Sequence, residues 1–263
     1  MMNPKIVVVI ACFNHGEYLP EAVASVLAAK REDVELIVVD DGSTDERTRW
    51  EIERLRADGI KVIRQENKGQ ASARNAAIAA SSASYILPLD ADNRLRSGYF
   101  EQAPRILDSQ PEVGVVYADA GYIGERTGRW RVGPFDRAQL MNANYIDTCA
   151  MYRRQVWEQN GGYDQTRLED WDFWLGALEH GWKFVYIPEI FFEYRQSQGS
   201  RHTRRVESHT REFIAKKHAM LYREAWESLE AERRSIRKTF GNLCRLLNLR
   251  LKDKLRGSNG RSS

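Results

Sequence analysis

The feature that most restricts the fold is an unbroken apolar run near the N-terminus. Ile6–Cys12 reads IVVVIAC, mostly β-branched and without a polar position. A strand with one face in water alternates apolar and polar residues, so this run indicates a strand buried on both faces, as in parallel sheets. Parallel strands need a crossover between them, usually a helix. The run therefore predicts that helices alternate with further strands.

The next 80 residues show this alternation. Further strands are expected at Glu35–Asp40, Ile60–Arg64 and Tyr85–Leu89, and helices around Ala22–Leu27 and at Arg47–Ala57 and Ala71–Ala80. Such a pattern predicts an α/β sheet with right-handed crossovers. Ligands of these sheets bind beyond the carboxyl ends of the strands.

The second half of the chain is less regular. Gly98–Ser109 is expected to form a helix, Val113–Tyr117 a strand and Gly121–Gly133 a hairpin that turns at ERTG. Farther on, KFVYIP and IFFEYR are expected as two strands. Between the hairpin and these strands, LEDWDFWLGALEH is expected as a helix with acidic residues in its first turn.

Acidic residues gather where the predicted strands end. They are Asp40, Asp41, Asp45, Asp90 and Asp92. Each alone could form a turn or cap a helix, as Asp45 fits the start of the second helix. Together they need cations or hydrogen-bond donors, because clustered carboxylates repel one another.

Asp90 and Asp92 stand on either side of Ala91 in YILPLDADN. In an extended chain, residues i and i+2 point to the same side, about 6.5 Å apart. Carboxylate oxygens without nearby His or Cys suit Mg²⁺ or Mn²⁺, which bridge proteins to substrate phosphates. The pair predicts a metal–diphosphate site. No G-x-x-x-x-G-K-[ST] loop is present and no G-x-G-x-x-G follows the first strand, which argues against P-loop and dinucleotide sites.

Asp170 is the candidate for a general base. It lies at the start of the helix predicted from LEDWDFW, where the helix N-terminus favours an ionised carboxylate. The alternative is an acidic first turn that only stabilises the helix. Trp171 and Trp174 flank this position. Their rings could cover a sugar or could face the core.

Charge and cysteine usage restrict partners and compartment. The net charge is +3, and from Ala231 onward there are ten Lys and Arg against two acidic residues, so the basic excess belongs to the C-terminal segment. This balance argues against nucleic acid as a partner. Cys12, Cys149 and Cys244 are far apart and form no C-x-x-C pair, which favours a reducing compartment. No apolar stretch approaches the roughly 18 residues of a membrane span, and we expect a cytoplasmic protein.

The C-terminal segment predicts a basic amphipathic helix over Val206–Arg256, kinked near Gly241. One face carries Ile236, Phe240, Leu243, Leu247, Leu251 and Leu255, with Lys and Arg mostly opposite. Such a helix could lie on the inner face of an anionic membrane, where a lipid-linked acceptor would wait. Alternatively, its apolar stripe packs on the catalytic domain or on a second subunit.

Six stretches together resemble the family 2 glycosyltransferases. They are VVVIACFN, ELIVVDDGSTD, NKGQASARNAAI, YILPLDADN, GGYD and EDWDFWLGAL, and they cover about Lys5 to Ser200. The resemblance implies the GT-A fold, a Rossmann-like, mostly parallel sheet flanked by helices, here with a helical C-terminal extension. It divides the chain into a catalytic domain at 1–200, with a nucleotide-binding half at 1–95 and an acceptor-side half at 96–200. A helical extension at 201–256 and a disordered tail at 257–263 follow.

The resemblance also implies a role for each matching position. Ala11 and Phe13 line the nucleoside pocket, Asp41 binds the uracil ring, Gly69 allows close backbone approach, Arg74 lies near the nucleotide, Asp90 and Ala91 contact the donor, Asp92 binds the metal and Asp170 deprotonates the acceptor. The implied reaction is an inverting transfer from a nucleotide sugar, most simply a UDP-sugar, with Mg²⁺ or Mn²⁺. The acceptor would be a hydroxyl of a saccharide or lipid-linked molecule in polysaccharide or glycolipid synthesis.

The sequence departs from the family pattern in two places. Ala11 and Cys12 precede the Phe-Asn pair, where relatives often carry Pro or Thr, and Ser197 stands where many relatives have a His. His202 could substitute for that His, and Arg195 and Arg201 could contact phosphates.

Two rival functions stay open, a nucleotidyltransferase that makes sugar nucleotides and a non-catalytic nucleotide-sugar-binding protein. The sequence leaves the oligomeric state open.

Overall fold

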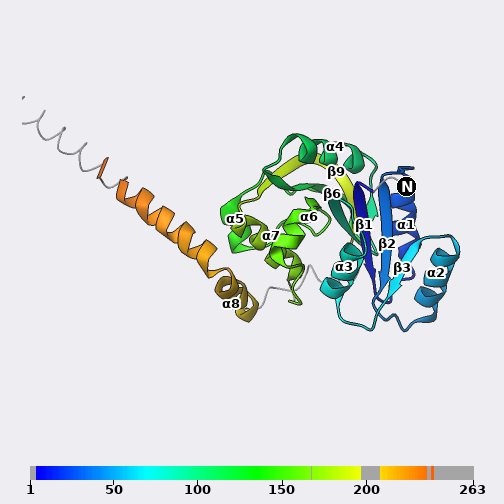
Figure 1. Cartoon of the computed structure of the whole chain (residues 1–263). Helices are drawn as coiled ribbons and strands as arrows, with labels where there is room; N and C mark the ends of the chain where they lie inside the picture. Colours follow the sequence, from blue (N-terminus) through cyan, green and yellow to red (C-terminus); the bar gives the residue numbers. More distant parts are fainter. Residues whose placement is uncertain (1–3, 167, 197–207, 236–237, 240–263) are drawn as a thin grey trace, which may run out of the picture. The chain divides into compact units, whose positions relative to one another are not determined.

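The computed structural model describes residues 4–166, 168–196, 208–235 and 238–239 (Figure 1). The chain forms two compact units, Met1–Ile214 and Ala215–Ser263. The boundary expected at residue 200 falls among residues outside the described part. The division into domains therefore stays a prediction.

The first unit is built on a mixed sheet. Its strands in the described part are β1 (Ile6–Cys12), β2 (Val34–Asp40), β3 (Lys61–Arg64), β4 (Tyr85–Asp90), β5 (Arg94–Leu95), β6 (Val113–Gly124), β7 (Gly128–Trp130), β8 (Met151–Arg153) and β9 (Lys183–Gln196). Their order is β3-β2-β1-β4-β8-β6-β9-β5, and β7 pairs with β6. The first four strands run parallel, and β8 is antiparallel to both of its neighbours.

Helices cover both faces of this sheet (Figure 1). They are α1 (Leu19–Leu27), α2 (Glu46–Ala57), α3 (Gln70–Ala79), α4 (Gly98–Ser109), α5 (Arg137–Asn142), α6 (Arg154–Asn160) and α7 (Glu169–Glu179). In Figure 1, α1 and α2 lie on one side of the first strands and α3 on the other. The carboxyl ends of β1, β2 and β4 thus open onto one common edge.

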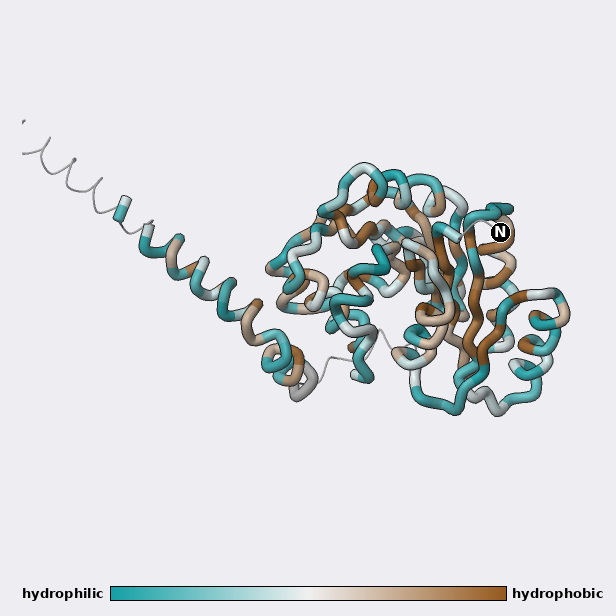
Figure 2. The backbone as a smooth tube through the Cα atoms, viewed as in Figure 1, coloured by the Kyte–Doolittle hydropathy of each residue, from teal (hydrophilic) through white to brown (hydrophobic). Residues whose placement is uncertain are grey.

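The apolar run of β1 is buried on both faces, as predicted. Ile6, Val8 and Ile10 pack in one core with residues of α1, α2 and α4, while Val7 and Val9 are buried on the opposite side. The strands are accordingly among the most hydrophobic segments of the chain (Figure 2). Burial of both faces requires the helical layers and so determines the three-layer arrangement.

Most of the predicted elements are present with small shifts at their ends. The β1 strand and the α4 helix have the predicted bounds, and the hairpin is confirmed by pairing of Tyr122 with Gly128. The prediction of two strands in KFVYIP and IFFEYR is wrong, because β9 is continuous. Its register on β6 jumps from Ile187 to Ile190. A bulge at this point accommodates Pro188, which has no N–H for the ladder.

Four short elements, β5, α5, β8 and α6, were not expected from the sequence. Each spans seven residues or fewer, too short for a helical or strand period to stand out. Pairing of β8 with β4 and β6 brings residues 143–150 beside the carboxyl end of β4. This placement has direct consequences for the site.

Part of the expected C-terminal helix is described. The α8 helix spans Ser208–Lys217, and residues 219–235 are helical as well. The expected kink near Gly241, most of the apolar stripe and the tail at 257–263 lie outside the described residues. None of the described helices is both long enough and apolar enough to cross a membrane.

Asn75 joins α3 to the second half of the unit. Its amide nitrogen donates to Tyr163 O at 2.8 Å, while its Oδ1 accepts from Trp157 Nε1 at 2.9 Å and from Tyr163 N at 2.8 Å. The Asn75 side chain thus links α3 to α6 and to the segment between α6 and α7. No sequence motif pointed to this role.

We predict that Asn75→Ala destabilises the protein by about 3 kcal/mol, because three hydrogen bonds worth about 1 kcal/mol each are lost. Urea unfolding followed by circular dichroism measures this change. Asn142→Ala, at an exposed position on α5, is the matched control and should change stability little. An equal effect of the two substitutions would contradict the assigned role of Asn75.

Candidate functional site

The carboxyl end of β1 lies between the carboxyl ends of β2 and β4. In register, Ala11 lies between Val39 of β2 and Asp90 of β4. Phe13 follows the strand with 41% of its surface exposed. An exposed aromatic ring at the sheet edge is available to stack on a planar base.

Asp41 organises the loop that leads into α3. Its Oδ1 accepts from Gln65 Nε2 at 2.7 Å and Lys68 N at 2.9 Å, and its Oδ2 accepts from Gly69 N at 2.9 Å. Gly69 has a φ of +87° and open space where a Cβ would lie. The backbone at Gly69 therefore has open space beside it, where a ligand could approach closely.

Two of the clustered acids have local roles. Asp45 caps α2 by accepting from Thr48 N at 2.8 Å, as its sequence context predicted. Asp40 is fully buried and accepts from Ser43 N at 2.8 Å. Backbone N–H groups thus offset much of the repulsion that was expected among the acids at this edge.

Asp90 and Asp92 lie on either side of a residue that faces inward. Ala91 is buried and belongs to the hydrophobic core, so only its backbone is available to a donor. Asp90 Oδ1 accepts from Gln70 Nε2 at 2.8 Å and Arg74 Nη2 at 2.9 Å. Burial raises the pKa of Asp92 to about 6, and the charge of Asp90 adds to the rise.

Arg195 and Asn93 hold the turn after β4. Arg195 Nε donates to Asp92 O at 2.9 Å, and Arg195 N donates to Asn93 Oδ1 at 2.9 Å. The Arg195 guanidinium also pairs with Glu21 at 2.6 Å and lies 4.5 Å from the ring centre of Tyr18. Arg195, considered from sequence as a phosphate contact, has structural partners on α1 and on the Asp92 turn.

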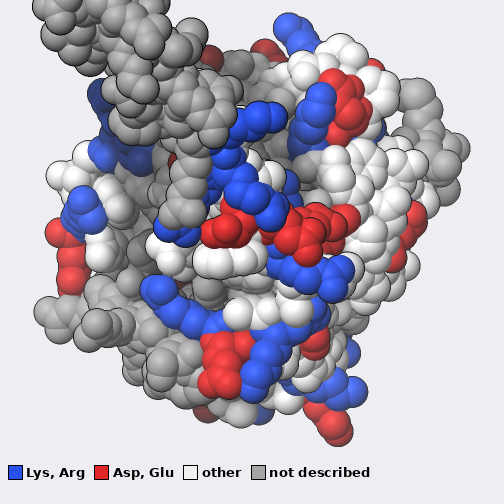
Figure 3. Space-filling view, turned by 90° about the vertical axis from the view of Figure 1, so that its left-hand side faces the viewer, with Lys and Arg blue, Asp and Glu red and all other residues white. Residues whose placement is uncertain are grey.

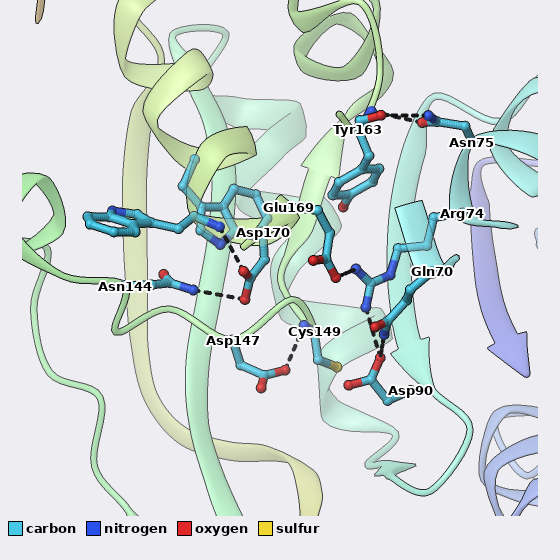
Figure 4. Close-up of polar contacts among 12 residues, drawn as sticks. Gln70, Arg74, Asn75, Asp90, Asn144, Asp147, Cys149, Tyr163, Glu169 and Asp170 are labelled. Atoms are coloured by element: carbon cyan, nitrogen blue, oxygen red, sulfur yellow. Dashed lines mark hydrogen bonds and ion pairs between the residues drawn. The ribbon is translucent and has the colours of Figure 1, made fainter. Parts of the chain in front are cut away.

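Arg74 is almost completely buried between two carboxylates. Its Nη2 pairs with Asp90 Oδ1 and its Nη1 with Glu169 Oε1, each at 2.9 Å (Figure 4). Burial lowers the pKa of Arg74, but Asp90 and Glu169 raise it by more, so the guanidinium stays charged. Arg74 therefore joins the end of β4 to the start of α7.

Asp170 is the second residue of α7. Burial raises its pKa to about 7, and neighbouring Glu169 adds to the rise, while Arg74 and the Trp171 N–H oppose it. These effects outweigh the helix N-terminus, which was expected to keep the group ionised at neutral pH. A carboxylate with a pKa near the working pH is well matched to general base catalysis.

Trp171 and Trp174 belong to the core. Their exposed fractions are 2% and 0%. Their indole nitrogens donate to Leu140 O at 2.6 Å and to Ile146 O at 3.2 Å. Of the two readings left open by the sequence, packing applies to both residues.

Sequence reasoning missed Asn144, Asp147 and His15. Asn144 Nδ2 donates to Asp170 Oδ2 at 2.8 Å (Figure 4). Burial raises the pKa of Asp147 to about 8, with Asp90 the next contributor, and Asp147 also interacts with Asp170. His15 is close enough to Asp92 to lower its pKa. Only the FNH stretch after β1 hinted at His15, and nothing in the sequence placed residues 144–147 here.

The carboxylates after β4 suit a hard divalent cation bound together with a substrate. Apart from its own backbone N–H, no described residue donates a hydrogen bond to the Asp92 carboxylate. In the described part of the chain, no group of three or more His, Cys, Asp or Glu residues forms a metal cage. This arrangement fits Mg²⁺ or Mn²⁺, which commonly use one or two carboxylates and complete their shell with phosphate oxygens and water.

The outer surface carries mixed charge. Figure 3 shows Lys and Arg side chains beside Asp and Glu side chains on one face of the molecule. Among the described residues on this face, opposite charges therefore offset one another over short distances. Near Asp90 and Asp170, the buried Arg74 guanidinium offsets part of the negative charge of the carboxylates.

Two family profiles match the chain. Glycosyl transferase family 2 matches residues 7–161, and glycosyl transferase family group 2 matches residues 85–250. GlyG of Streptococcus pneumoniae is 34% identical over 224 residues, which cover 76% of this chain and 73% of GlyG. An uncharacterized glycosyltransferase of Nostoc sp. is 38% identical over 116 residues, 43% of this chain. The chain spans 36% of the length of that relative.

Solved structures share the architecture. TarS of S. aureus in complex with UDP-GlcNAc superposes with a TM-score of 0.67 at 18% identity, covering 82% of this chain and 66% of TarS. Mannosyltransferase PcManGT from Pyrobaculum calidifontis, in complex with GDP-Man and Mn²⁺, superposes with a TM-score of 0.59 at 18% identity. That match covers 77% of this chain and 60% of PcManGT. These likenesses confirm the predicted GT-A fold. With the family 2 profile matching more than half of its length, the chain belongs to glycosyltransferase family 2.

Proposed function

We propose that the chain is an inverting glycosyltransferase that transfers a sugar from a UDP-sugar to a hydroxyl acceptor, assisted by Mg²⁺ or Mn²⁺. The acceptor is a saccharide or a lipid-linked molecule in polysaccharide or glycolipid synthesis. The proposal rests on one arrangement, in which Arg74 joins the donor-side carboxylate Asp90 to Glu169, the residue before the candidate base Asp170.

The reaction is a single displacement at the anomeric carbon. Asp170 accepts the proton of the acceptor hydroxyl as the oxygen forms a bond to this carbon. The bond from the carbon to the diphosphate oxygen breaks, and its electron pair leaves with the nucleoside diphosphate. Because the attack comes from the side opposite the leaving group, an α-linked donor gives a β-glycoside.

Residues at the strand ends hold the donor. Asp92 binds the divalent cation, and Asp90 contacts the ribose or the sugar. When bound, the cation offsets the charge that develops on the leaving diphosphate. Phe13 and Ala11 line the nucleoside pocket, Asp41 contacts the base, and Gly69 lets the backbone approach. The UDP-GlcNAc and Mn²⁺ in the two solved structures support this choice of donor class and cation.

Location and membrane contact are also proposals. The three widely spaced cysteines favour the cytoplasm, and Cys12 and Cys149 are buried free thiols. A lipid-linked acceptor would bring the protein to the inner face of the membrane. The basic residues after Ala231 would make that contact, and most of them lie outside the described residues.

We predict that Asp92→Ala weakens Mn²⁺-dependent binding of UDP by at least about tenfold, the lower end of the loss seen when a metal ligand loses its hydrogen-bond partner. Isothermal titration calorimetry with and without Mn²⁺ measures this change. Asp58→Ala, at an exposed position after α2, serves as the matched control. Binding of UDP that is independent of both Mn²⁺ and Asp92 would remove the assigned role of Asp92.

Substitution of the base tests catalysis separately from binding. We expect Asp170→Asn to lower UDP release from UDP-GlcNAc by about 10²- to 10⁴-fold, the usual contribution of a general base. Binding of UDP with Mn²⁺ should stay unchanged. Retained turnover in Asp170→Asn would rule out this residue as the base.

The same assays separate the rival functions. A nucleotidyltransferase would release pyrophosphate from a nucleoside triphosphate and a sugar phosphate. The stretch after β1, Phe13–Leu19, contains no Lys or Arg to hold a triphosphate. A binding protein would bind UDP-sugars without turnover in either the native chain or Asp170→Asn.

A further inference from the structure

The segment that includes α5 and the residues after it is fastened to the helix of the candidate base. Trp171 donates to Leu140 O at 2.6 Å, and Trp174 donates to Ile146 O at 3.2 Å. Both tryptophans lie in the first two turns of α7. They hold residues 140–146 at a fixed place against the start of this helix.

Asn144 lies between these two attachment points and is half-buried. Its Nδ2 donates to Asp170 Oδ2 at 2.8 Å, and its Oδ1 accepts from Ile146 N at 3.3 Å (Figure 4). The opposite orientation of the amide would place its oxygen against the carboxylate and its NH₂ against the Ile146 N–H. The two partners therefore fix which end of the amide faces Asp170.

The Asp170 carboxylate is oriented from two sides. Trp171 N donates to Oδ1 at 2.8 Å, and Asn144 donates to Oδ2. A carboxylate has about four acceptor positions. These two donors therefore orient the group without occupying all of its lone pairs.

We infer that Asn144 is a positioning residue for Asp170, holding the carboxylate in one orientation and stabilising its ionised form. This inference rests on the proposed role of Asp170 as the base. A hydrogen bond from a neutral donor to a charged carboxylate is stronger than one between neutral groups. The Asn144 amide therefore favours the form of Asp170 that can accept a proton.

The other charged and titratable groups around Asp170 act in both directions. Glu169 on α7, Asp90 on β4 and Asp147 before β8 disfavour the ionised form, and Arg74 on α3 favours it. Tyr163, before α7, also interacts with Asp170. Because these three carboxylates already disfavour the ionised form, loss of the Asn144 donor should raise the pKa of Asp170 by a measurable amount.

Asn144→Leu removes the donor and approximately keeps the side-chain volume. Burial raises the pKa of Asp170 to about 7, and we expect the titration midpoint of this group in Asn144→Leu to lie about one pH unit above that of the native chain, because a hydrogen bond to a charged group is lost. The measurement is ¹³C NMR of the aspartate carboxyl carbons across pH in the full chain. Absence of one resonance in Asp170→Asn assigns the signal.

Asn142→Leu makes the same change at an exposed position of α5 and should leave the midpoint unchanged. Asn144→Ala is the second variant, in case the leucine side chain disturbs folding, and thermal unfolding monitors both. An Asp170 midpoint in the folded Asn144 variants equal to that of the native chain would overturn the inference. If a substitution only loosened the fold, many resonances would change, and a rise confined to the Asp170 midpoint would not be seen.

The titration does not depend on turnover, so the role of Asn144 and the role of Asp170 as the base can be contradicted separately. If Asp170→Asn retains UDP release from UDP-GlcNAc, the proposed base is wrong, whatever the titration shows. If Asp170→Asn is inactive and Asn144→Leu leaves the Asp170 midpoint unchanged, only the role of Asn144 is wrong.

Discussion

The arrangement of the candidate site depends on the two ion pairs of the buried Arg74 guanidinium. A charge taken out of water is stable only with close partners, and here these are Asp90 and Glu169, one from each half of the first unit. The pairing fixes the end of β4 against the start of α7. Asn75, one residue along α3, adds a neutral link to the Tyr163 backbone. Two adjacent residues of α3 thus link the end of β4, the start of α7 and the segment between α6 and α7.

The acids of the site divide into two groups by what offsets their charge. Asp41 and Asp45 accept backbone N–H groups and shape loops and caps. Burial raises the pKa of Asp92, Asp147 and Asp170, although Asp170 accepts two hydrogen bonds. Raised pKa values mark the places where the protein leaves charge for a cation or a proton to offset. This division agrees with the proposed donor site next to the proposed base.

In the first 95 residues, local sequence patterns predicted most of the helices and strands. The β1 run predicted a strand buried on both faces, and both faces are buried. A run of this kind depends only on neighbours within a few positions. The extended chain expected through Asp90 and Asp92 is instead a turn, in which Asn93 N donates to Asp90 O at 3.0 Å. The bulge at Pro188 and the short β8 strand were missed, because pairing with β6 determines both.

The sequence by itself determined the α/β class, and it marked candidate site residues at the ends of the predicted strands. Only the tertiary structure decided which groups surround them. Asn144 and Asp147 lie near Asp170 because β8, which follows them, pairs with strands distant in sequence. The tryptophans of α7 face the core because α5 and the residues after it accept their N–H groups. The physical reason is that pKa values and hydrogen bonds depend on distances between segments, and these distances are set only when the sheet assembles.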